Sequence, residues 1–150
     1  MKRALALSIV LELVVRWALY SQSGTAGILQ LQTRSKPWPA NSTGNVNINV
    51  IIKEGFKIPK RPSPKLQINP TPEFEVKGET NFTEEGRGKD PEYFNAFKPM
   101  SLQVAATKTT EAGRYSLSGK FVYFYCSDRE KYCSRSVENV QIPIEIVAGK

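Results

Sequence analysis

The two cysteines of the chain are the residues whose type and spacing could do chemistry. Cys126 and Cys133 flank a short polar stretch, Ser127–Tyr132. Two cysteines at this spacing can form a structural disulfide. They can also perform thiol–disulfide exchange, in which a thiolate attacks a disulfide sulfur and forms a mixed-disulfide intermediate. Either chemistry requires that the chain hold the two sulfurs together.

Charged residues next to the cysteines would tune such an exchange. Cations stabilise a thiolate and so favour the reactive form of a cysteine. The cations close in sequence to the pair are Arg129, Lys131 and Arg135. Asp128 and Glu130 have the opposite effect, so the sequence does not show whether the neighbouring charges favour or disfavour the thiolate.

The segments around the cysteines predict a β-hairpin. Phe121–Tyr125 is aromatic and β-branched, which favours a strand. The segment after Cys133 has apolar residues at every second position, which also favours a strand: Val140, Ile142, Ile144 and Ile146. Antiparallel strands place opposite Cα atoms about 4.5–5.5 Å apart, within the range of a disulfide. We therefore predict a Cys126–Cys133 disulfide at the hairpin end.

Two functions remain open for this pair. The first is a redox-active disulfide, for which the nearby rings of Tyr125 and Tyr132 are candidates to shield the sulfurs. The second is a structural staple, because most disulfides in exported domains are structural. In the chain-entropy model, a closed loop of this size contributes roughly 2.5 kcal/mol to stability.

Composition excludes several other functions. The chain has no histidine, which removes histidine-based general-base catalysis, and two cysteines alone cannot complete a zinc site. We predict neither a metal nor a small-molecule cofactor. The net charge is +7, but the basic residues are scattered and do not form the clustered stripe typical of nucleic-acid binding.

The N-terminus has the pattern of an export signal. Lys2 and Arg3 precede an apolar run over residues 4–15, and small residues at Gly24 and Ala26 suit a cut after Ala26. Glu12 interrupts the run. We predict that residues 1–26 are a signal peptide, with membrane association through residues 4–20 as the alternative. The protein is then periplasmic or extracellular, and in the alternative it is anchored to the membrane.

The rest of the chain has the alternation and turns of an all-β domain. We expect residues 27–45 to be a linker, with a short first strand as the alternative, and residues 46–147 to form one domain. Apolar residues alternate through Val46–Ile52 and again through Leu102–Ala106. Gly78–Pro99 is a long irregular stretch, and its aromatic residues suggest that it packs on something.

The order of these parts resembles the N-terminal periplasmic domains of the thiol:disulfide interchange protein DsbD. The resemblance covers roughly residues 46–147. The strand Val46–Ile52 leads into Glu54–Pro59, and a later strand ends in Tyr125-Cys126-Ser127-Asp128, before Cys133 and a closing strand. Here Ser134 follows the second cysteine, where the family commonly has proline.

The resemblance implies an immunoglobulin-like antiparallel β-sandwich and an electron-carrier function. By position, Cys126 and Cys133 match the family's redox pair. Tyr93 and Phe94 match its aromatic cap loop. The implied partners are a thioredoxin-like exported protein or a membrane electron donor. The alternative is a non-catalytic immunoglobulin-like binding or structural module whose disulfide staples the hairpin.

Overall fold

The computed structural model describes residues 27–78, 80–86 and 90–149. The predicted signal or anchor, residues 1–26, lies outside the described residues. The described chain contains strands and turns but no helix, and hence no helix long and apolar enough to cross a membrane. The strands are β1 (Leu29–Ser35), β2 (Trp38–Pro39), β3 (Thr43–Ile52), β4 (Phe56–Pro59), β5 (Lys65–Ile68), β6 (Phe74–Lys77), β7 (Tyr93–Phe94), β8 (Met100–Ala106), β9 (Gly113–Ser127) and β10 (Cys133–Val147).

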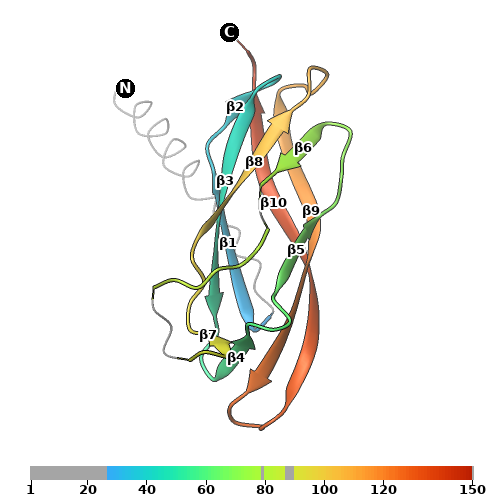
Figure 1. The fold of residues 1–150 in the computed structure, drawn as a ribbon. Coiled ribbons are helices and arrows are strands. Elements are labelled where there is room, and N and C mark those ends of the chain that lie inside the picture. The colour runs from blue at the N-terminus through green and yellow to red at the C-terminus, as the bar shows by residue number, and fades with distance from the viewer. Residues whose placement is uncertain (1–26, 79, 87–89, 150) are drawn as a thin grey trace, which may run out of the picture.

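These strands form two packed sheets (Figure 1). One sheet has the order β1-β3-β8-β6, and the other has the order β2-β10-β9-β4-β7, with β5 also paired to β9. All pairs are antiparallel except β2 with β10. The first sheet corresponds to strands A, B, E and D of an immunoglobulin domain, in that order. In the second sheet β10 corresponds to strand G, β9 to strand F, and β4 and β5 together to strand C. The predicted immunoglobulin-like sandwich is confirmed.

Residues 27–45 correct the linker expected there. β1 pairs with β3 along its whole length, from Leu29 opposite Ile52 to Ser35 opposite Val46. β2 then joins the edge of the other sheet through Trp38. The segment is therefore part of the sandwich, as in the strand alternative. Pro37 and Pro39 flank Trp38 at this edge, where a missing N–H is tolerated.

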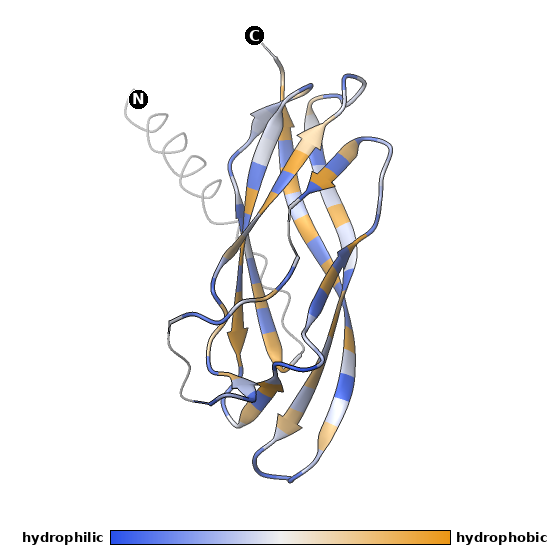
Figure 2. Ribbon diagram, in the orientation of Figure 1, coloured by the Kyte–Doolittle hydropathy of each residue, from blue (hydrophilic) through white to orange (hydrophobic). Residues whose placement is uncertain are grey.

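The core lies between the sheets and follows the period-two pattern. Hydrophobic and hydrophilic residues alternate along the long strands (Figure 2). Leu117, Phe121 and Tyr123 of β9 are each 1% exposed. They face buried residues of the other sheet, such as Val46 and Leu102. Burying one such side chain contributes about 1.5–3 kcal/mol, so this interior positions the strands.

The irregular stretch before β8 also contributes to the core. Phe82, Phe94 and Phe97 are buried, and the ring of Phe82 stacks on Phe121 with centroids 5.0 Å apart. The expectation that this stretch packs on the domain is confirmed. Its packing places β7 beside β4, next to the hairpin formed by β9 and β10.

A substitution at Gly119 tests the close approach of the β5 backbone to β9. A Cβ at Gly119 would overlap the backbone carbonyl of Gln67 on β5, whereas a Cβ at Gly113 of the same strand would make only an ordinary contact, 3.8 Å from Tyr115. We expect Gly119→Ala to lower the unfolding free energy by about 1–3 kcal/mol, because backbone must move. The control Gly113→Ala should be nearly neutral. Urea unfolding measures both, and equal effects would contradict the close approach.

Candidate functional site

The disulfide lies at the far end of the β9–β10 hairpin. Cys126 is opposite Cys133 at the end of a ladder of fourteen residue pairs. Their Cα atoms are 4.0 Å apart, and the disulfide is formed. The predicted bond is therefore confirmed. In Figure 1 this end of the hairpin lies near β4 and β7, at the opposite end of the sandwich from the C-terminus.

This bond differs from the usual immunoglobulin disulfide. That disulfide joins strands B and F across the two sheets and sits in the core. Here the bond joins neighbouring strands of one sheet, at positions next to the turn. The disulfide does not join the two sheets. It therefore constrains the end of the hairpin rather than the packing of one sheet on the other.

The two cysteines differ in exposure. Cys133 is exposed, whereas Cys126 is half-buried. The hydroxyl of Tyr93 lies 4.0 Å from the Cys126 sulfur. Tyr93 therefore covers one sulfur while leaving the other accessible, which brings together three of the residues predicted from the sequence.

The remaining predicted residues lie elsewhere. Side chains of neighbouring residues on a strand point to opposite faces, so Tyr125 lies on the face of β9 opposite Cys126. There it meets Phe56 and Tyr132, with ring centroids 5.9 Å and 6.2 Å away. Hydrogen bonding to Tyr125 raises the pKa of Tyr132 to about 12. Phe94 is 7% exposed in the core, so it supports β7 and does not touch the sulfurs.

Sequence reasoning missed Lys57 as a site residue. β4 pairs with β9 so that Lys57 is opposite Cys126. Its ammonium lies 5.8 Å from the centre of the Tyr93 ring and 3.2 Å from Asp128. The sequence places Lys57 far from the cysteines, and nothing local marks the β4–β9 pairing that brings it there.

A polar network fixes the segment that carries Tyr93. Lys60 forms an ion pair of 2.6 Å with Glu84 and donates to the Asp90 carbonyl at 2.9 Å. Glu84 also accepts from the backbone and side chain of Asn95. The hydrogen bonds from Lys60 and Asn95 lower the pKa of Glu84 to about 2. This network ties both sides of β7 to the end of β4.

The face of the hairpin that carries the disulfide continues as a strip in which Arg135 is the one charged residue among apolar neighbours. We call it the hairpin outer face: the opposed pairs Cys126–Cys133, Phe124–Arg135 and Val122–Val137. Val137 is 46% exposed. Two lysines lie beside this strip: Lys65 of β5 pairs with Val122, and Lys120 lies two residue pairs beyond Val122, on the same face of β9. The disulfide thus adjoins an exposed apolar surface with a basic rim.

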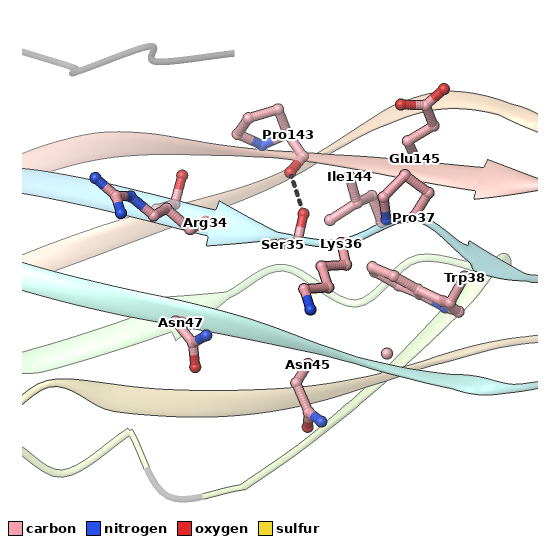
Figure 3. Close-up of a pocket in the computed structure, with 12 residues that line it drawn as sticks. Arg34, Ser35, Lys36, Pro37, Trp38, Asn45, Asn47, Pro143, Ile144 and Glu145 are labelled. Atoms are coloured by element: carbon pink, nitrogen blue, oxygen red, sulfur yellow. Dashed lines mark hydrogen bonds between the residues drawn. The ribbon is translucent and has the colours of Figure 1, made fainter.

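A hollow of about 730 Å³ lies apart from this site, on β1, β2, β3 and β10. Figure 3 shows Lys36, Asn45 and Trp38 around it. The Trp38 ring covers Gly44 so closely that no Cβ would fit there. Counted along β10 from Cys133 to Ile144, the hollow is about 35 Å from the disulfide, so it does not belong to the cysteine site.

No family model matches the chain, and no curated protein matches it. What can be stated of its class comes from the fold and the site. It is an immunoglobulin-like sandwich domain with one disulfide at the end of the β9–β10 hairpin.

The Lys60–Glu84 pair predicts a pH-dependent stability. A carboxylate whose folded pKa lies below its ordinary value stabilises the fold above that ordinary value, and the contribution disappears as pH falls through the folded pKa. We expect Glu84→Gln to lower Tm at neutral pH, with the difference from wild type vanishing between about pH 5 and pH 2.

The matched control for this test is Glu75→Gln. Glu75 pairs with Lys77 at 3.4 Å, but both side chains are more than half exposed, so the substitution should have little effect at any pH. Thermal unfolding followed by circular dichroism measures both variants. A constant difference between Glu84→Gln and wild type across the whole pH range would contradict the role given to Glu84.

Proposed function

We propose that this chain is an exported thiol–disulfide exchange domain that uses the Cys126–Cys133 disulfide as an electron carrier. The observation that carries the proposal is the asymmetry of the pair. Cys133 is exposed, while Cys126 is half-buried beneath the Tyr93 hydroxyl. A staple requires no such difference between its sulfurs, whereas exchange requires one sulfur that a partner can reach.

The exchange runs in two steps through a mixed disulfide. A thiolate of the partner attacks the Cys133 sulfur, the Cys126–Cys133 bond breaks, and Cys126 leaves as a thiolate. The partner's second thiolate then attacks the sulfur of the partner's first cysteine, which is bonded to Cys133 in the mixed disulfide. This bond breaks, and Cys133 leaves as a thiolate. Two electrons pass to this domain, the partner becomes a disulfide, and the thiolates released here take up protons according to their pKa values.

Lys57 is placed to assist the first step. It lies opposite Cys126, the leaving group, and a nearby cation stabilises a thiolate. Asp128, 3.2 Å from the Lys57 ammonium, partly offsets that charge. Arg135, named from the sequence as a candidate cation, lies one rung from Cys133 on the same face.

The hairpin outer face supports a thioredoxin-like exported protein or a membrane electron donor as the partner. Phe124, Val122 and Val137 offer apolar contact beside the disulfide. Arg135 lies among them, and Lys65 lies beside Val122 on the neighbouring strand. Charge complementarity favours a partner with carboxylates around an apolar surface that presents its cysteine. Export also fits the formed disulfide, because disulfides persist in oxidising compartments.

The structural-staple alternative has its own supporting observation. At this end of the hairpin, β10 is paired with β9 alone among the described strands, because β2 joins β10 at Ile146 and Val147. A disulfide between opposed residues would keep this end paired. In that case the domain is a non-catalytic binding or structural module.

The reduction potential of the pair distinguishes the two functions. We expect equilibration with glutathione or dithiothreitol buffers to give a value in the range of shuttling proteins, roughly −120 to −270 mV. Thermal unfolding of the oxidised and reduced forms is the companion measurement. A potential below about −300 mV, together with a large loss of Tm on reduction, would establish the staple and overturn the carrier.

Single-cysteine variants test which sulfur a partner reaches. Cys126→Ser leaves Cys133 exposed, and Cys133→Ser leaves Cys126 beneath Tyr93. We expect Cys126→Ser to form a mixed disulfide with oxidised glutathione several-fold faster than Cys133→Ser, because access limits the reaction. Mass spectrometry follows both variants, each of which lacks the disulfide and so controls for the other. Equal rates, or a faster Cys133→Ser, would refute the assignment of Cys133.

A further inference from the structure

Glu138 is a carboxylate on the inward-facing side of β10. Val140 and Ile142, which lie on the same face of β10, are buried in the core. Across the ladder Glu138 is opposite Phe121, which is 1% exposed. Glu138 itself is half-buried. A charge at such a position is costly unless hydrogen bonds and an opposite charge compensate it.

Glu138 accepts a hydrogen bond but has no counter-ion among the residues that the structure describes. The hydroxyl of Tyr123 donates to the Glu138 carboxylate. Burial, reinforced by this hydrogen bond, raises the pKa of Tyr123 to about 12, although the nearby Ser136 side chain and Ile28 backbone partly oppose this rise. Tyr123 is therefore a neutral donor at physiological pH. None of the ion pairs between described residues includes Glu138.

Gly27 lies directly against this carboxylate. A Cβ on Gly27 would overlap both oxygens of Glu138, and the φ of Gly27 is not in the left-handed region. A side chain at this position would therefore have to displace the Glu138 carboxylate. The backbone nitrogen of Gly27 is bonded to the same Cα that would carry this Cβ, so it lies within reach of the carboxylate.

Gly27 is also the first residue after the predicted export cut. We propose that Glu138 is the binding site for the α-ammonium group created when the signal is removed after Ala26. A peptidase hydrolyses the Ala26–Gly27 bond, so that water gives its hydroxyl to the Ala26 carbonyl and a proton to the Gly27 nitrogen. The new amine, with an ordinary pKa of about 8, is protonated at neutral pH and supplies the missing counter-ion.

The site connects maturation with the hairpin that carries the disulfide. In the precursor the Gly27 nitrogen is an uncharged amide, whereas in the mature chain it carries a positive charge next to Glu138. Tyr123 of β9 and Glu138 of β10 then hold the start of the chain against both strands of the hairpin. The pairing raises the pKa of the α-amino group, so its contribution to stability is present below about pH 8 and is lost as pH rises through the raised value.

The test compares proteins that begin at Gly27 and at Ala26, each released from a cleavable fusion, in the wild-type and Glu138→Gln backgrounds. We expect the Gly27 start to have a Tm about 2–6 °C above the Ala26 start. This difference should vanish in Glu138→Gln. Titration of the α-amino group by NMR should give a raised pKa only for the Gly27 start with Glu138 present.

Acetylation of the Gly27 start provides a variant that leaves Glu138 unchanged. It should reproduce the lower Tm of the Ala26 start even if Glu138→Gln fails to fold. Mass spectrometry of the full chain, expressed with export, should find Gly27 as the first residue. Equal Tm for the two starts, a difference that persists in Glu138→Gln, or a different first residue would each overturn the proposal. None of these readouts depends on the reactivity of the disulfide.

Discussion

The antiparallel pairing of β9 with β10 is the constraint on which the rest of the structure depends. Its fourteen residue pairs set which side chains enter the core and which face outward. The same register places Cys126 opposite Cys133, Tyr123 and Glu138 on the inner side, and Phe124 on the outer side. A slip of one residue would exchange these faces, so core packing and the cysteine site require the same alignment.

The chemistry of the site depends on segments that reach the hairpin from elsewhere in the chain. Tyr93 arrives on β7, which pairs with β4, and β4 pairs with β9. The buried rings of Phe94 and Phe97 hold this segment from the core side, while Lys60 and Glu84 hold it by charge. The accessible disulfide is thus surrounded by contacts between residues far apart in sequence.

The local pattern around the cysteines was sufficient to predict the hairpin and its disulfide, whereas the sandwich class was implied by the order of parts along residues 46–147. Alternation is a local signal, and it is strong in Val140–Ile146 because one face of that strand is buried. Residues 27–45 were misjudged because prolines and polar residues conceal a strand whose stability comes from pairing with β3. Phe94 was misplaced for a similar reason, since its neighbour Tyr93 reaches the sulfur while Phe94 enters the core.

By itself, the sequence determined the strands with clear alternation, the two cysteines at the ends of a hairpin and the absence of histidine chemistry. These properties depend on residue type and short-range spacing. Only the tertiary structure decided that Cys133 is exposed while Cys126 lies under Tyr93, that Lys57 faces the pair, and that Gly27 lies against Glu138. Each of these depends on the pairing or packing of distant segments, and that long-range geometry has no local signature.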